Sequence, residues 1–349
     1  MTEPRHSARM RRLDEHLAKV STAIQPVPAP QVRVEGPGVE YVSGSEVPFH
    51  GASAGKLVTT ALIGRLIDDG TIGPHSRIAS LLPEEDTRGL FVHKGIDRLG
   101  EVTVDHLLAH TSGVADYFEG PARGVATVEK QAVSQPDRTW TPREMLAHSR
   151  DHQTPVAAPG RKFSYSDTGY ILLGRIIEEA YGAALHDAAR ERVFAPLGMT
   201  RSWYAARSQP IEGDTVIEPL WLGPHEVSTT NALSVDWAGG GVAATAADWI
   251  RLSRGLWDGS LLRPDTARAI CARRNTFRMG IGYGAGAMVL NLRTLAPFMR
   301  SLPTVANGHL GITSVHVWHF AETDTHVVMN FHDTRLMRRS FVTLTALPL

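Results

Sequence analysis

The chain has 349 residues, enough for two structural units with a large buried core. Its 36 lysines and arginines balance 36 aspartates and glutamates, so the formal net charge is zero and neither nucleic acid nor an anionic membrane is indicated as a partner. The single cysteine, Cys271, cannot form an internal disulfide, and no apolar run has the length of a signal peptide or a membrane span. We therefore expect a cytoplasmic globular protein.

The first third of the chain mixes helix and strand patterns. Apolar residues recur every three or four positions over 8–24, which predicts an amphipathic helix that ends before three closely spaced prolines. VRVEGPGVEYV follows, and its two β-branched runs around Gly-Pro-Gly predict a hairpin. A long helix is then expected from about Ser53 to Asp69, ending at Gly70.

Helical patterns dominate from about 75 to 270, and β patterns return after Met279. The helical segments include TVDHLLAHTSG, TPREMLAHSRDH, GYILLGRIIEEAYG, LHDAARERVFAPLG and AADWIRLSRGLWDG. The later strand candidates are GAGAMVLNL, HLGITSVHVWHF and THVVMNFHD, before a final helix, TRLMRRSFVTLTAL. This order predicts an α+β fold: one antiparallel sheet built from both chain ends and flanked by terminal helices, with a mainly helical domain inserted. The predicted domains are 1–75 plus 271–349, and 76–270, with the active site at their junction.

The stretch HGASAGKL allows two interpretations. A phosphate-binding Walker loop needs glycine at position 50 and serine or threonine at position 57, but the chain has His50 and Leu57. The other interpretation is a nucleophile, Ser53, one helical turn before Lys56, because residues three apart share a helix face. A serine at a helix start lies beside free backbone N–H groups, and a nearby amine can help to take its proton. An N-cap serine followed by a surface lysine gives the same pattern.

Two distant segments supply further candidates. FSYSDTGYILLG places Tyr165 and Asp167 in a loop that opens a helix, where a tyrosine beside lysine is driven toward phenolate and carries protons. A buried tyrosine with a satisfied hydroxyl and an N-cap aspartate are the structural alternatives. GHLGITSVHVWHF places His309 and Gly311 at the start of a strand. If that strand lies beside the serine helix, the N–H groups of Ile312 and Ser53 can stabilise an oxyanion.

In their order along the chain, these segments resemble the SxxK serine-hydrolase superfamily: class C β-lactamases, DD-peptidases, D-aminopeptidases and related family VIII-type esterases. HLLAHTSG resembles the family's LLxHTSG segment, FSYSDTGYILLG resembles YSNxGYxLLG, and GHLG stands where the family has Lys-Thr-Gly or His-Thr-Gly. IASLLPEE, VFAPLGMTRS, AGGGVAATAADWIRL and LLRPDTA also have close counterparts. The matches cover nearly the whole chain, and the resemblance implies a β-lactamase/transpeptidase-like fold.

The resemblance also implies roles for individual residues. Ser53 would be the nucleophile, Lys56 and Tyr165 would share the acid/base work, and His309 would stand at the position of the family's third-motif lysine or histidine. The N–H groups of Ser53 and Ile312 would bind the oxyanion, with Asp167, Leu310 and Gly311 near the substrate. The implied reaction is acyl transfer from an ester or amide through an acyl-serine intermediate, to water or another acceptor.

Two departures from the family pattern bear on the substrate. Asp167 stands where asparagine is usual, and its carboxylate would either pair with Lys56 or attract a substrate ammonium. Leu310 stands where threonine or serine is frequent, which removes a hydroxyl suited to a substrate carboxylate. We therefore favour an esterase, amidase or acyltransferase acting on a small, amine-bearing molecule over a DD-peptidase or β-lactamase. A catalytically silent binding or assembly protein is the alternative from another class.

Other patterns support no cofactor. His106 and His110 have the spacing of two ligands on one helix face, but no third ligand is evident, and His316 and His319 point to opposite faces of a strand. The run of glycines at 239–241 lacks the spacing of a dinucleotide loop. We expect no metal and no cofactor, and a small-molecule ester or amide as partner; the oligomeric state stays open.

Overall fold

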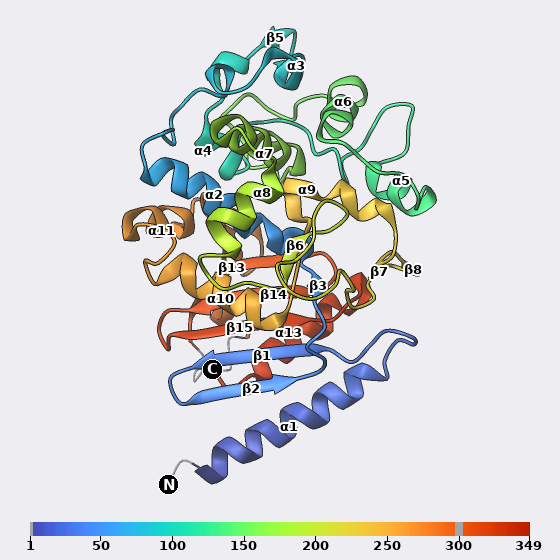
Figure 1. Ribbon diagram of the computed structural model, residues 1–349, viewed down its shortest axis with the longest axis vertical. Helices are drawn as coiled ribbons and strands as arrows, with labels where there is room; N and C mark the ends of the chain where they lie inside the picture. Colours follow the sequence, from blue (N-terminus) through green and yellow to red (C-terminus); the bar gives the residue numbers. More distant parts are fainter. Residues whose placement is uncertain (1–2, 297–302) are drawn as a thin grey trace.

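The computed structural model describes residues 3–296 and 303–349. Its centre is an eight-stranded antiparallel sheet with the order β10-β11-β12-β13-β14-β15-β1-β2 (Figure 1). The strands are β1 (Gln31–Gly36), β2 (Val39–Ser43), β10 (Asn275–Arg278), β11 (Ile281–Tyr283), β12 (Met288–Asn291), β13 (Val305–Gly311), β14 (Val315–Phe320) and β15 (Thr325–Asn330). Because β1 pairs with β15, the two chain ends form one sheet, as predicted.

Each face of this sheet is covered by helices because side chains alternate along the strands. Helices α1 (Glu3–Ser21) and α13 (Met337–Ala346) contact each other and cover one face, where Leu17 and Leu344 share a core with Trp318. Helix α10 (Ala246–Trp257) packs on the other face against β1, β14 and β15. There Val317 and Val328 join the larger core.

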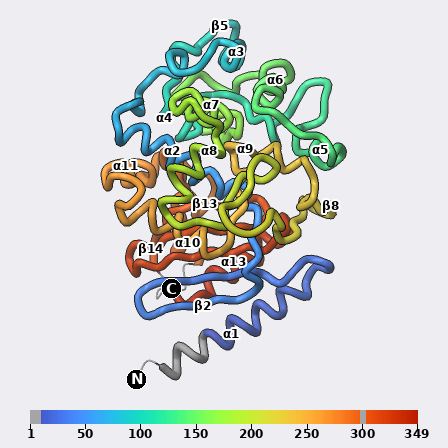
Figure 2. Tube along the Cα trace, in the orientation of Figure 1, coloured from blue at the N-terminus to red at the C-terminus, as the bar shows by residue number. Residues whose placement is uncertain are grey.

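The helical half of the molecule lies above the sheet in Figure 2, where the blue and red ends of the chain share the lower half and the green segments lie above. Helix α2 (Lys56–Asp68) runs between the two halves, buried on nearly all sides, and contacts α7, α8, α9 and α11. The other helices are α3 (Glu84–Thr87), α4 (Val104–Leu108), α5 (Val128–Ser134), α6 (Pro142–His152), α7 (Asp167–Tyr181), α8 (Leu185–Ala189), α9 (Trp237–Gly240), α11 (Pro264–Cys271) and α12 (Leu292–Leu295).

Short strands complete the structure. A three-stranded sheet of β3 (Phe49–His50), β9 (Val242–Ala244) and β6 (Ser202–Tyr204) lies next to the start of α2, and two small hairpins pair β4 (Val92–His93) with β5 (Ile96–Asp97) and β7 (Trp221–Leu222) with β8 (His225–Glu226). The α+β, β-lactamase/transpeptidase-like fold is thus confirmed. The domain boundaries at 75/76 and 270/271 stay predictions. None of the described helices has the length and apolar character needed to cross a bilayer.

Two local predictions need correction. The helix expected from Ser53 begins as a 3-10 turn, Ala52–Gly55, and becomes α-helical at Lys56. His309 and Gly311 lie at the end of β13, not at its start, because the strand begins at Val305. Position 308 of this strand requires glycine. A Cβ there would lie 1.9 Å from the Val317 carbonyl oxygen, so only glycine permits the pairing of β13 with β14.

Candidate active site

Ser53 lies in the tight turn that precedes α2. Ala52, immediately before it, has a φ of +46°, a left-handed conformation that L-residues adopt at a cost. A Cβ on Gly240 would lie 2.3 Å from the Ala52 carbonyl oxygen, and a Cβ on Gly311 would lie 2.5 Å from the Gly51 carbonyl oxygen. The turn is therefore held between the end of α9 and the end of β13 by backbone contacts that only glycine permits.

Lys56 is fully buried one turn after Ser53. Its Nζ donates to Ser53 Oγ over 3.2 Å, donates to the carbonyl oxygen of Gly239, and forms an ion pair with Asp167. The three partners match the three N–H donors of an ammonium group. The predicted meeting of Ser53 and Lys56 is present, and the Lys56 amine is fixed rather than extended into solvent.

Asp167 is the first residue of α7, and its side chain pairs with Lys56 instead of facing an open site. Of the two roles considered for this residue, the structure contains the ion pair. Its backbone N–H donates to Asp116 Oδ1 over 2.9 Å. Burial and the Asp167 charge raise the pKa of Asp116 to about 7, and desolvation and the same charge raise the pKa of Asp236 to about 7.

Sequence reasoning missed Asp116 and Asp236. They come from the loop after α4 and from the residue before α9, far from each other and from Asp167 along the chain. No spacing rule connects them, since only the tertiary fold brings Asp116 and Asp236 close to Asp167. The signal available in the sequence was the position of Asp116 shortly after the HTSG segment that resembles the family's LLxHTSG motif.

Tyr165 is half-buried, with its ring centroid 5.1 Å from Lys56 Nζ, and its ring packs on His110 at 4.2 Å. Desolvation and the Asp167 charge raise the pKa of Tyr165 well above its ordinary value, and the Ser53 hydroxyl lowers it by less. The expectation that lysine drives this phenol toward phenolate is therefore wrong, because desolvation and the Asp167 charge both favour the neutral phenol. Within residues 3–296 and 303–349, the Tyr165 hydroxyl has no hydrogen bond of good geometry.

His309 belongs to a row of buried polar aromatic side chains. Its Nδ1 lies 2.9 Å from the Leu310 carbonyl oxygen, and its Nε2 lies 3.2 Å from the Tyr283 hydroxyl, which in turn lies 3.2 Å from the Tyr170 hydroxyl. Burial and the Lys56 charge lower the pKa of His309 to about 3, so the ring is neutral at physiological pH. The His309 ring centroid lies 6.4 Å from that of Tyr165, and among the described residues His309 forms no hydrogen bond with Ser53.

The residues after His309 divide between two faces of β13. Gly311 faces the Ser53 turn, and Ile312, which follows it, has a backbone N–H that donates to no other backbone group among the described residues. Leu310 points the other way, into the core beneath α1 and α13. The structure therefore does not support Leu310 as a substrate-binding residue, because successive strand residues point to opposite faces.

Two cavities flank this centre. One is lined almost entirely by apolar side chains and reaches Ala52 and Ile312; its other walls are Phe118, Ala132, Val133, Leu220, Leu222, Val227, Ala232, Leu233 and Val235, with His50, Asp236 and Thr313. The second has a mixed lining and reaches Tyr165 and Ser164; its charged and polar walls include Asp116, Glu119, Arg123, His152 and Gln153. The first cavity thus reaches the residue before Ser53, and the second reaches Tyr165; apolar walls with a few polar groups are usual in small-molecule sites.

His106 and His110, which have the spacing of two metal ligands, each accept a backbone hydrogen bond instead. His106 Nδ1 accepts from the Thr103 N–H, and His110 Nδ1 accepts from the Ser166 N–H. Cys271 is the last residue of α11, where its thiol donates to the Ala267 carbonyl oxygen and burial raises its pKa to about 12. It is accordingly a packing residue and not a nucleophile.

Comparisons with known proteins agree with this geometry. The Beta-lactamase family matches residues 44–345. Penicillin-binding protein 4 of Amycolatopsis lactamdurans is 30% identical over 258 residues, covering 68% of this chain and 57% of that protein. Lovastatin esterase of Penicillium rubens is 26% identical over 270 residues, covering 71% of this chain and 64% of that protein. The chain thus spans less than two thirds of these relatives' length.

Solved structures share the fold at lower identity. A D-stereospecific amidohydrolase from Streptomyces sp. superposes with a TM-score of 0.77 and 22% identity, covering 95% of this chain and 96% of that one. EstCE1, a hydrolase with promiscuous acyltransferase activity, gives a TM-score of 0.74 and 18% identity, covering 97% and 98%. The chain therefore belongs to the Beta-lactamase family, within the SxxK serine-hydrolase superfamily that its motifs resemble.

Proposed function

We propose that this protein is a serine-dependent acyl hydrolase or acyltransferase that cleaves an ester or amide bond through an acyl-Ser53 intermediate. The observation that carries the proposal is the fully buried Lys56, whose Nζ lies 3.2 Å from Ser53 Oγ at the start of α2. In a family of serine hydrolases, a buried lysine that contacts a serine hydroxyl activates that serine as the nucleophile. Family membership and the two flanking cavities support the same reading.

The geometry suggests how protons move. The substrate carbonyl oxygen would accept from the N–H groups of Ser53 and Ile312 while Ser53 Oγ bonds to the acyl carbon. As the bond to the leaving group breaks, the Ser53 proton passes to the Tyr165 oxygen and the phenol's own proton passes to the leaving atom. This relay suits a phenol that stays neutral at rest. Water or another acceptor then reverses the same steps and frees Ser53.

In this scheme Lys56 donates to Ser53 Oγ, so its charge orients the hydroxyl and stabilises the oxygen as it loses its proton. The neutral His309 does not touch Ser53; it supports the wall of the site through Tyr283. In this proposal the charge of Lys56 stabilises the Ser53 oxygen, and Tyr165 transfers the proton. His309 becomes a positioning residue.

The two cavities suggest a substrate class. Since Tyr165 protonates the leaving group, that group lies on the Tyr165 side, in the cavity that contains Asp116 and Glu119, and the acyl group extends past Ile312 into the apolar cavity. We expect an apolar acyl chain and a polar leaving group. An amine on the substrate would meet Asp116 and Glu119, because the Asp167 carboxylate is already paired with Lys56. Lovastatin esterase and a monacolin J acid methylbutanoyltransferase of Aspergillus terreus, both relatives, are named for related acyl chemistry.

Intact-mass analysis with a fluorophosphonate probe and a β-lactam tests the nucleophile. We expect one adduct on the wild type, none on Ser53→Ala, and an unchanged adduct on Ser80→Ala, which alters an exposed serine. A panel of p-nitrophenyl esters of rising acyl length, D- and L-aminoacyl amides and a chromogenic cephalosporin then ranks substrates. Fast cephalosporin turnover would indicate a β-lactamase, and the absence of any adduct or turnover would indicate a silent binding protein.

A further inference from the structure

A second cluster of chemically active side chains lies away from Ser53, where β14 and β15 meet in a tight turn. His319 on β14 and His326 on β15 are direct cross-strand partners. Their rings stack with centroids 4.4 Å apart and an angle of 14° between their planes. Asp324, in the turn that joins the two strands, completes a group of three, the one such group of potential metal ligands in the described part of the chain.

The ligand atoms of this group converge on one point. Asp324 Oδ1 lies 3.3 Å from His319 Nε2 and 3.8 Å from His326 Nε2, and the three atoms all lie within 4.8 Å of one another. A tetrahedral zinc ion at about 2.0–2.1 Å from each ligand places neighbouring ligand atoms roughly 3.3–3.4 Å apart. The present spacing is therefore near that of a metal site, and because the rings are nearly parallel, the side chains turn toward each other when both Nε2 atoms bind one ion.

Helix α10 fixes both imidazole rings from outside the group. Ser253 Oγ lies 2.8 Å from His326 Nδ1, so the other ring nitrogen, Nε2, faces Asp324. The Trp257 ring stacks parallel to His319 at an angle of 13°. Hydrogen bonds to the second imidazole nitrogen are the usual support of metal-binding histidines because they set the tautomer and the ring orientation.

The group is open to solvent on one side, and the positive charge near it is balanced by a carboxylate. His326 is buried, but the Asp324 side chain is 73% exposed, which leaves an open side for a water ligand. The nearest cation, Arg254, already pairs with Glu35 at 2.8 Å, and Glu35 also pairs with Arg33, so this guanidinium is balanced.

We propose that His319, Asp324 and His326 form a binding site for a divalent transition metal, zinc foremost, with one coordination position left to water. Two imidazole nitrogens and one carboxylate suit zinc and disfavour calcium and magnesium, which take oxygen ligands. Bound there, the ion links the two strands to their turn beneath α10, so it stabilises this end of the sheet. The site is independent of the acyl chemistry at Ser53.

Zinc titration calorimetry on the full, tag-free chain after chelator treatment tests the site. We expect one zinc ion per chain, and a cobalt-loaded sample with the visible absorption of four-coordinate Co²⁺. Asp324→Asn and His319→Gln should each weaken zinc binding at least tenfold, and Ser253→Ala should weaken it about 10–100-fold through the lost support of His326. His225→Gln, which removes an exposed histidine of β8, serves as the matched control and should bind as the wild type does.

The proposal is overturned if wild-type protein takes up no zinc, or if zinc binding and the cobalt spectrum survive Asp324→Asn. Asp324 is an exposed turn residue, so this variant is expected to keep the native circular dichroism spectrum even if a histidine variant does not fold. A second readout is the melting temperature, which should rise with zinc for the wild type and His225→Gln but not for Asp324→Asn. Equal rises in all three would also reject the site.

Discussion

The substitution Asp167→Asn tests how much the buried ion pair between Asp167 and Lys56 stabilises the folded protein. Lys56 has a side chain that is 0% exposed, and that of its partner Asp167 is only 12% exposed. Removing one partner of a buried ion pair costs about 3–5 kcal/mol because the other charge stays buried without compensation. The asparagine oxygen can still accept a hydrogen bond from Lys56, so we expect a loss of about 3 kcal/mol, the lower end of that range.

The loss should depend on pH in a direction set by Asp116 and Asp236, whose pKa values are raised to about 7 partly by the Asp167 charge. At pH 5 both carboxyl groups are protonated in the folded protein, so they do not repel Asp167. The variant then loses the ion pair with Lys56 and gains nothing from the removal of repulsion. At pH 8 both are ionised and repelled by Asp167 in the wild type, so removing that charge relieves the repulsion. The destabilisation should thus be larger at pH 5 than at pH 8.

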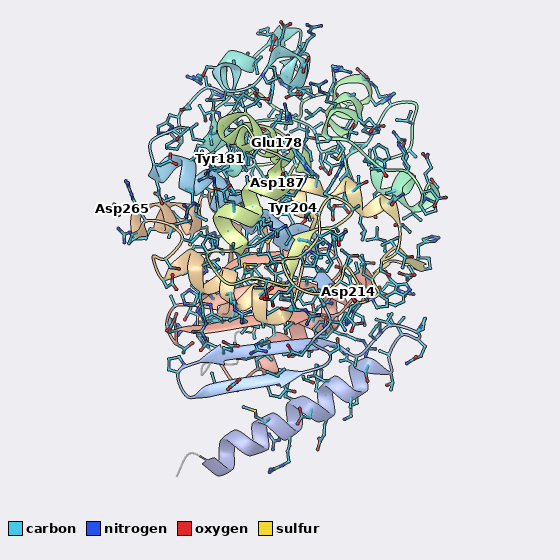
Figure 3. The ribbon with its side chains drawn as sticks, in the orientation of Figure 1. Glu178, Tyr181, Asp187, Tyr204, Asp214 and Asp265 are labelled. Carbon is cyan, nitrogen blue, oxygen red and sulfur yellow. The ribbon has the colours of Figure 1, made fainter. Side chains whose placement is uncertain are left out.

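Urea denaturation followed by tryptophan fluorescence at the two pH values measures this difference. Asp265→Asn is the control, since Asp265, labelled at the left edge of Figure 3, forms an exposed pair with Arg268 in which its own side chain is 91% exposed. Such pairs contribute little. Equal stability of Asp167→Asn and wild type at pH 5, or a loss that grows with pH, would refute the assignment of a stabilising buried pair.

Three other substitutions separate catalysis from stability. Tyr165→Phe removes a hydroxyl without a good hydrogen bond among the described residues, so the melting temperature should hold while acylation, followed by stopped flow with a p-nitrophenyl ester, slows about 10²–10⁴-fold; unchanged acylation would exclude the proton relay. Gly311→Ala places a Cβ 2.5 Å from the Gly51 carbonyl oxygen and displaces the Ile312 N–H, so kcat should fall about 10²–10³-fold; a normal kcat in a folded variant would remove Ile312 from the oxyanion site. The pKa of Asp236 is raised from 3.8 to about 7, so the folded state holds an extra proton between these values, and Asp236 alone should lower wild-type stability by at most about 4 kcal/mol as pH rises from 4 to 7. Asp236→Asn should make the slope shallower while the contribution of Asp116 remains, and an equally steep slope in both proteins would contradict the assignment.

The parts of the fold that repeat a local pattern could be predicted from the sequence. The hairpin β1–β2 follows from VRVEGPGVEYV, and α7 follows from the apolar period after Tyr165. The pairing of Ser53 with Lys56 follows from their spacing of three on one helix face, although the first turn is 3-10. In each case one short segment contains all the residues that the prediction needs.

The sequence was least informative where residues meet through the tertiary fold. Nothing local links Tyr283 on β11 to His309 on β13, yet they form a hydrogen bond across the sheet. Leu310 was assigned to the substrate because it stands where the family often has threonine or serine, but strand alternation sends it into the opposite core. The direction of the Tyr165 pKa was wrong because desolvation, and then the carboxylate that pairs with Lys56, raise it, and both depend on the tertiary fold.

Glycines explain why the site is rigid at its centre and variable at its edges. Gly240 and Gly311 bring two backbone segments against the Ser53 turn at distances that no side chain would allow, so the proposed nucleophile and oxyanion donors are held by α2, α9 and β13. Many of the cavity walls, in contrast, come from the segments after α4, α6 and β8. Changes in those segments can therefore alter which acyl and leaving groups fit, without moving the groups that we propose for acyl transfer.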